Sequence, residues 1–209
     1  FEPDILMNIG TAYMNMDSLD LALNYQNKTC KISKGKDDKQ YAKGLTNIGD
    51  IYLIKKDYDN AKSKFITSLA ISKGRMENKS IADNNLGLAK VYYAEKQPGK
   101  SIDLCNIIIK NKYYKDNESL IGVYDVLHKS YEMSGNLGRS LYYLKKFNKT
   151  EKIINSLDNE RKTLQAEIGY VFTKKLDEKE KEKLVNEQKL ERQKYINYGV
   201  MLITVLIAI

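Results

Sequence analysis

Residues 47–65, NIGDIYLIKKDYDNAKSKF, contain the pattern that decides the fold. Gly49 is followed three residues later by Tyr52, and Ala61 lies nine residues beyond that tyrosine. The polar stretch KKDYD separates two apolar stretches of helical period and supplies aspartates that can cap a helix. The segment therefore predicts two helices joined by a short turn.

The same pattern recurs along the chain at a nearly constant interval. Its tyrosines are separated by 39, 40, 39 and 39 residues: Tyr13, Tyr52, Tyr92, Tyr131 and Tyr170. Nine positions after each of the first four lies a small residue: Ala22, Ala61, Ser101 and Ser140. A period of tens of residues is typical of a solenoid, in which each unit packs only on its neighbours. We expect four helix pairs within 1–152, in units of about 3–37, 38–76, 78–115 and 116–152, with Gly35 and Gly74 as helix C-caps.

Composition agrees with an ordered helical protein and disfavours one functional class, direct nucleic-acid binding. The 209 residues include 30% charged side chains, only 2 prolines and no tryptophan. The net charge is +8, but acidic and basic residues are interspersed, so we expect no direct nucleic-acid binding by this region. Cys30 and Cys105 lie two repeats apart, too far for a disulfide, and are predicted to be small core residues.

The repeat resembles the tetratricopeptide repeat. Gly49, Tyr52, Ala61, Phe65 and Leu69 fill that family's small, aromatic, alanine, aromatic and aliphatic positions. The other units match less closely: Gln26 replaces an aromatic, and the triplet at 85–87 lies two residues out of register with Tyr92. The resemblance implies an all-α, right-handed solenoid with a concave groove that holds an extended peptide.

By the same resemblance, polar residues on the first helix of each pair are candidates for the peptide-binding groove. They are Asn8, Thr11, Lys43, Asn47, Asp50, Lys90 and Lys129. An amide side chain can bind a peptide backbone because it both donates and accepts hydrogen bonds. Asp83 and Gly87 occupy sites where binding of a C-terminal carboxylate requires basic groups, which disfavours that mode. Ordinary solvated surface is the alternative interpretation of each residue.

Beyond the repeats, residues 153–194 lack proline and predict a capping helix that continues as a charged stalk or coiled coil. An apolar stripe that includes Leu164, Ile168 and Val171 could pack on the fourth unit. A homodimer through the stalk and a solvated single helix are the two alternatives.

Residues 195–209, YINYGVMLITVLIAI, contain no charge and predict the start of a truncated, single-pass transmembrane helix. A buried terminal helix is the alternative. Basic residues precede this run, but glutamates lie among them, so charge alone does not orient the protein.

No catalytic, metal-binding or cofactor-binding cluster is recognisable. The single histidine, His128, takes a helix-contact position within the fourth repeat, and the two cysteines are distant from each other. We therefore expect no enzyme within this chain and no cofactor or metal.

The order of repeat array, charged helix and apolar run resembles the sensory region of Bacteroidetes-type membrane-bound tetratricopeptide signalling proteins. In those proteins the span leads to a histidine kinase of a two-component system or to a helix-turn-helix regulator. The resemblance implies a periplasmic or other extracytoplasmic module that binds a protein or peptide. A membrane-tethered scaffold without an output domain and the N-terminal part of a transcriptional regulator are the alternatives.

Overall fold

The computed structural model describes the backbone of residues 2–114 and 116–207, and their side chains except those of 117, 118, 195 and 200–207. The chain divides into two compact units, Phe1–Ile154 and Asn155–Ile209. Each unit is described by itself below.

The described residues form eight helices and no strand. The helices are α1 (Glu2–Asn15), α2 (Leu19–Ser33), α3 (Asp38–Ile54), α4 (Tyr58–Gly74), α5 (Asn78–Ala94), α6 (Pro98–Lys110), α7 (Asn117–Met133) and α8 (Leu137–Ile207). The prediction of an all-α solenoid is confirmed over this part of the chain.

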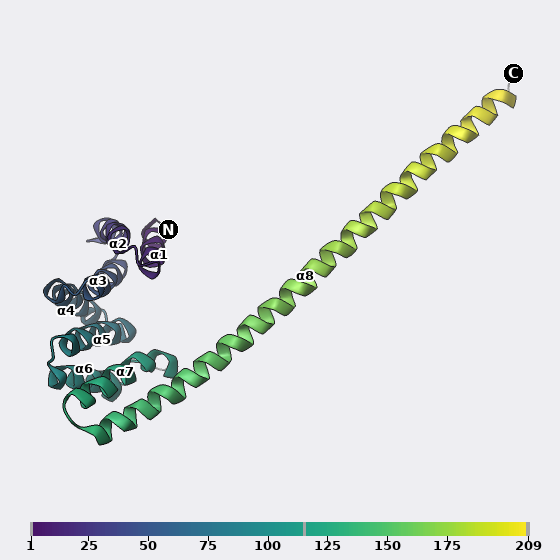
Figure 1. The fold of residues 1–209 in the computed structure, drawn as a ribbon. Coiled ribbons are helices and arrows are strands. Elements are labelled where there is room, and N and C mark those ends of the chain that lie inside the picture. Colours follow the sequence, from purple (N-terminus) through teal and green to yellow (C-terminus); the bar gives the residue numbers. More distant parts are fainter. Residues whose placement is uncertain (1, 115, 208–209) are drawn as a thin grey trace. The chain divides into compact units, whose positions relative to one another are not determined.

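The first unit is a stack of helix pairs (Figure 1). From α1 to α7 each helix packs on the next one in the chain. The first helices of successive pairs also contact one another, α1 with α3, α3 with α5, and α5 with α7. The odd-numbered helices therefore form one continuous layer, which is the layer that lines the groove in a solenoid of helix pairs.

The repeated tyrosines have a backbone role at the end of each first helix. The carbonyls of Tyr13, Tyr52, Tyr92 and Tyr131 each accept a hydrogen bond from the amide five residues later, at 2.8–2.9 Å. A left-handed residue closes each of these turns: Asp17, Lys56, Lys96 and Gly135. This arrangement satisfies carbonyls that the helix end would otherwise leave unpaired.

The second helices end in a similar way, with one departure from the expected C-caps. Gly35 has a φ of +73°, as a C-cap glycine requires. Gly74 is instead the last residue of α4, and Met76, with a φ of +54°, takes the left-handed position. Helix α4 continues two residues beyond Ser72, the position equivalent to the end of α2 at Ser33. Gly74 therefore lies inside the helix.

Phe65 of α4 fills the space between α3 and α5. Its side chain is fully buried, and a Cβ built on Gly49 or Gly87 would lie 2.7 or 2.5 Å from its ring. Ala89 instead contacts α6, where Ser101 Oγ donates to the Ala89 carbonyl at 2.8 Å. The register of the third repeat therefore follows Ala89 and Tyr92, while Gly87 accommodates the preceding repeat's phenylalanine.

The repeated side chains are not equally buried. Tyr131 is 6% exposed and stacks on Tyr143 with ring centroids 5.7 Å apart, whereas Tyr52 and Tyr92 are half-buried. Cys30 and Cys105 are buried free thiols, which confirms their prediction as core residues.

The second unit consists, in its described residues, of the continuation of α8 (Figure 1). Leu164, Ile168 and Val171 are exposed on it, and so is Tyr170 at 71%. The expected packing of this stripe on the fourth helix pair stays a prediction.

The structure gives no support to the expected transmembrane segment. Within its described residues, no helix combines the length and apolar character needed to cross a bilayer. Residues 208–209 of the segment 195–209, and the side chains of 195 and 200–207, lie outside the described residues.

Candidate functional site

A cavity of about 230 Å³ opens between α3 and α5, on the layer of first helices. Its lining comes from these two helices and from Tyr114, which lies in the link between α6 and α7. The lining residues are Lys43, Thr46, Asn47, Asp50, Ser80, Asp83, Leu86, Gly87, Lys90 and Tyr114.

Helical spacing explains how these side chains reach one place. Lys43, Asn47 and Asp50 follow one another at intervals of four and three on α3, and Asp83, Gly87 and Lys90 do so on α5. Since the repeat is 40 residues long here, Lys43 corresponds to Asp83 and Asp50 corresponds to Lys90. Equivalent positions of neighbouring repeats therefore carry opposite charges.

A polar network behind the cavity fixes the separation of α3, α4 and α5. Thr46 Oγ1 lies 3.0 Å from Asn84 Oδ1 and 2.9 Å from Ser68 Oγ. Asn84 Nδ2 donates to Ser68 Oγ at 3.0 Å, and Ser68 Oγ donates to the Ala42 carbonyl at 2.8 Å. Because Ser68 and Asn84 are fully buried, these bonds supply the partners that they require.

Asp83 is held by an aromatic hydroxyl from outside its own helix. The Tyr114 hydroxyl donates to Asp83 Oδ1 at 2.6 Å. Burial raises the pKa of Asp83, while this hydrogen bond and the nearby Lys79, Lys90 and Lys43 oppose the shift. Burial and the bonded carboxylate together raise the pKa of Tyr114, so the phenol stays protonated and remains a donor.

Asp50 lies in the same cavity without such a donor. Burial raises the pKa of Asp50 to about 6, opposed by the positive charge of Lys90 and reinforced by the negative charge of Asp83. The described residues contribute no hydrogen bond and no ion pair to its carboxylate. The centre of the groove thus contains one acid with a hydrogen-bond donor from the described residues and one without.

A second cavity, of about 440 Å³, extends the first along the same helices. Its lining residues are Lys39, Lys43, Glu77, Asn78, Lys79, Ser80 and Asp83. Lys43, Ser80 and Asp83 belong to both cavities. The two form one polar groove across α3 and α5, with exposed lysines at its rim.

The structure brings together four of the seven residues expected in the groove: Lys43, Asn47, Asp50 and Lys90. Asn8 is exposed on α1. Thr11 lies on the same helix, and its Oγ1 donates a hydrogen bond to the Met7 carbonyl. Lys129 on α7 forms an ion pair with Asp125 at 2.7 Å. These three residues do not line either groove cavity.

Sequence reasoning missed Thr46, Ser80 and Tyr114, and counted Asp83 only as an obstacle to a carboxylate ligand. Thr46 lies three residues after Lys43 on α3, and Ser80 lies three residues before Asp83 on α5. This helical spacing puts both on the groove face, so the sequence pattern could have identified them. Tyr114 carries no such signal, because it lies between helices and 31 residues from its partner Asp83.

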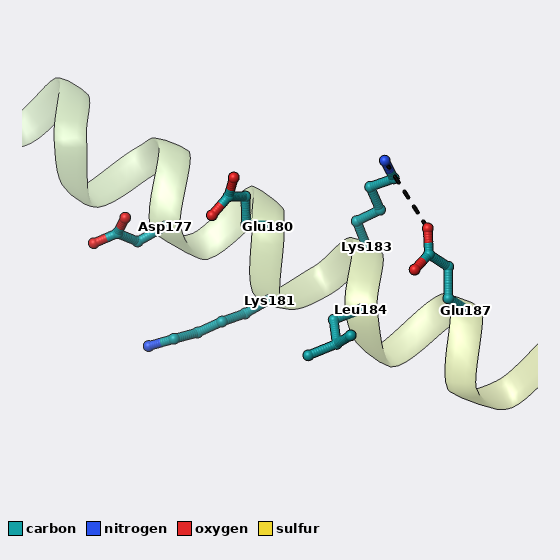
Figure 2. Close-up of a pocket in the computed structure, with 6 residues that line it drawn as sticks. All are labelled: Asp177, Glu180, Lys181, Lys183, Leu184 and Glu187. Atoms are coloured by element: carbon teal, nitrogen blue, oxygen red, sulfur yellow. Dashed lines mark ion pairs between the residues drawn. The ribbon is translucent and has the colours of Figure 1, made fainter.

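A further surface depression lies on α8 and lacks the walls of a binding site. Figure 2 shows its lining residues, which include Lys181, Leu184 and the ion pair of Lys183 with Glu187 at 3.9 Å. All of them project from a single helix. Binding sites are concave and enclose most of a ligand, which one helix cannot do.

Nothing in the described part of the chain assembles a metal centre. No group of three or more His, Cys, Asp or Glu side chains there could hold an ion. His128 Nδ1 lies 2.8 Å from Ser140 Oγ, so the only histidine joins α7 to α8 within the fourth helix pair.

Residues 3–35 and 42–78 match the tetratricopeptide repeat family. These two segments are tetratricopeptide repeats. They comprise the helix pairs α1–α2 and α3–α4 and therefore include the α3 side of the groove. No curated protein matches the chain in sequence.

Several solved structures share the solenoid fold. BtubC from P. vanneervenii has a TM-score of 0.62 and 14% identity, over 73% of this chain and 64% of BtubC. Aspartyl phosphate phosphatase F from Bacillus subtilis has a TM-score of 0.63 and 12% identity, over 73% of this chain and 41% of that protein. MamA has a TM-score of 0.52 and 18% identity, over 74% of this chain and 81% of MamA. The chain thus spans less than two thirds of the first two, and identities this low establish the fold alone.

Proposed function

We propose that residues 1–154 form a non-enzymatic binding module that holds a peptide, or an extended segment of a protein, in the groove across α3 and α5. The observation that carries this proposal is that the side chain of Asn47 lines the groove without a hydrogen-bond partner among the described residues. This side chain is half-buried. A free amide beside a groove can donate to and accept from a peptide backbone at once.

The binding module is tested with the full chain and a library of random heptapeptides displayed on phage. We expect selected peptides to bind in solution and to lose about tenfold in affinity when Asn47→Ala removes hydrogen bonds to the backbone. Asn27→Ala is the matched control, because Asn27 is exposed on α2, the second helix of its pair. Equal loss in both variants, or no loss in either, would place binding elsewhere.

Our finer proposal is that this module is the sensory region of a membrane-anchored signalling protein, with the repeats on the extracytoplasmic side. It rests on the sequence of residues 195–209 and on the 71-residue helix α8 that precedes and enters this run. Flotation of the full chain with phosphatidylcholine vesicles tests the anchor. A chain that stays at the bottom of the gradient as completely as its 195–209 deletion would exclude a membrane anchor.

The finer proposal includes a homodimer through α8. Its support is the exposed apolar series of Leu157, Leu164, Ile168 and Val171, whose intervals of seven, four and three follow a coiled-coil seam. Sedimentation equilibrium of the full chain should give a dimer that Ile168→Asn dissociates and Gln165→Asn does not. A monomer at all concentrations contradicts it.

A further inference from the structure

The feature that the proposed groove leaves unexplained is the carboxylate of Asp50. It lines the cavity between α3 and α5, and the described residues provide it with neither a hydrogen bond nor an ion pair. Asp83, the other acid in the cavity, has the Tyr114 hydroxyl at 2.6 Å. Such a carboxylate is partly desolvated, and a ligand that supplies N–H groups would offset that cost.

The positive charges around the cavity do not already supply this donor. Lys43 and Lys90 are exposed, and neither ammonium lies within ion-pair distance of Asp50 or Asp83 in the described structure. Lys79 lines the adjoining cavity, and its positive charge opposes the rise in the pKa of Asp83 that burial causes. Salt screens exposed charges over about 10 Å, whereas partly buried carboxylates are screened less. Close attraction by the two acids therefore opposes repulsion by the lysine rim.

The size of the cavity indicates what part of a ligand it can hold. Its volume of about 230 Å³ is smaller than the roughly 300–1,000 Å³ typical of sites for whole small molecules. It opens into the larger polar groove of about 440 Å³ along the same two helices. One long side chain of an extended peptide suits such a compartment, while the rest of the peptide lies in the groove.

We propose that this cavity takes a basic side chain of the bound peptide, with Asp50 and Asp83 accepting hydrogen bonds from its nitrogen atoms. The proposal rests on the groove binding a peptide and names the residue class that the groove selects. Arginine fits best, because its planar guanidinium offers five N–H donors and can bond two carboxylates at once. Tyr114 then positions Asp83, and Asn47 remains available to the peptide backbone.

The test uses three blocked pentapeptides that differ only at the centre, Ac-Gly-Gly-X-Gly-Gly-NH2, with arginine, citrulline or glutamate as X. Citrulline keeps the shape of arginine and removes its charge. Backbone amide resonances of the isotope-labelled full chain report where each peptide binds. We expect the arginine peptide to shift amides in 46–50 and 83–87, and to bind at least about tenfold tighter than the citrulline peptide.

Asp50→Asn should abolish the preference for arginine over citrulline, whereas Asp103→Asn should retain it. Asp103 is the matched control because it is exposed on α6 and the substitution changes net charge equally. Affinity for the arginine peptide should also fall as pH decreases from about 7.5 to about 5. Asp50 becomes protonated in this range and loses its charge. The groups that face it are Lys43, Lys90, Asp83 and the Tyr114 hydroxyl, and the hydroxyl stays neutral.

Equal binding of arginine and citrulline peptides overturns the inference, as does tighter binding of the glutamate peptide or the absence of shifts in 46–50 and 83–87. These failures remain separate from failure of the groove itself. A phage-selected peptide that loses affinity in Asn47→Ala but not in Asn27→Ala would show that the groove binds peptides without selecting a basic residue.

Discussion

At the scale of single residues, the contact of Phe65 with two glycines determines how closely α3 and α5 approach. The ring lies where a Cβ on Gly87 would be 2.5 Å from Cε1, a distance that real side chains do not adopt. We expect Gly87→Ala to reduce the free energy of unfolding by about 1–3 kcal/mol, because the buried aromatic ring must move out of a well-packed site. Urea unfolding followed by circular dichroism measures the change.

Gly99→Ala is the matched control, since nothing lies within 4 Å of a Cβ at that exposed helical position. Its effect should stay within about 0.5 kcal/mol. Combining Gly87→Ala with Phe65→Leu should cost less than the sum of the two single changes. Full additivity would show that the ring and the glycine are not in contact.

Asp50 gives a prediction with a definite dependence on pH. Burial raises its pKa in the folded protein to about 6, above the value of about 3.9 for an unfolded chain. The folded state therefore binds more protons between these values, and the contribution of Asp50 to stability, full below about pH 4, is lost as pH rises through 6. Asp50→Asn should raise the free energy of unfolding by about 1–3 kcal/mol at pH 7.5 and change it little at pH 4.

Thermal unfolding of both proteins across this pH range measures that difference, with Asp103→Asn as the control that shows no such trend. A destabilised Asp50→Asn protein at pH 7.5 would mean that the carboxylate has a partner. If Asp50→Asn is stabilised as expected, stability and peptide preference oppose each other at Asp50, because the same substitution improves folding and impairs recognition.

The groove residues also show where sequence patterns stop being informative. Lys43, Asn47, Asp50 and Lys90 were predicted to line the groove, and the structure places them around one cavity because helical spacing and a 40-residue period put them there. Tyr114 could not be found in this way, since it belongs to an irregular link and meets Asp83 through the packing of distant segments.

At the scale of helices, capping differs between units that otherwise repeat. Asp57 Oδ1 accepts a hydrogen bond from the Asn60 amide at 3.2 Å at the start of α4. Ser18 occupies the corresponding N-cap of α2 and forms no such bond through its side chain. Asp57→Ala should therefore cost about 1 kcal/mol of stability, whereas Ser18→Ala should cost less than about 0.5.

Chemical denaturation of the two variants beside the unmodified chain measures the difference. Equal losses would mean that residue type, and not the observed hydrogen bond, determines stability at these caps. The sequence predicted both turns, because each contains residues suited to a cap, but the side-chain geometry at each cap depends on local backbone angles that the pattern does not specify.

Helix ends were less predictable than helix faces. Tyr13, Tyr52, Tyr92 and Tyr131 identified the first helices because their spacing reflects one repeated packing arrangement. The end of α4 was not predicted correctly, since Gly74 resembles a C-cap in sequence while Met76 adopts the left-handed conformation. The energy difference between stopping at either residue is small, so one glycine does not determine the boundary.

At the scale of the whole molecule, the division after Ile154 separates two kinds of helical stability. Within Phe1–Ile154 each helix from α1 to α7 packs on its neighbours, so burial of apolar surface supports every turn. The described part of the second unit is a single charged helix. We expect residues 1–154, expressed alone, to fold and to unfold in one cooperative transition.

The fragment 1–154 should retain the near-ultraviolet circular dichroism of the stacked Tyr131 and Tyr143 rings, which both lie within it. Its unfolding midpoint should stay close to that of the main transition of the full chain, because the buried core residues of the described part belong to the first unit. A phage-selected peptide should also bind it with unchanged affinity, since the groove ends at Tyr114. Loss of the tyrosine signal or a broad, non-cooperative transition would instead show that folding of the solenoid requires residues beyond Ile154, and would assign 155–209 a structural role in the repeat array.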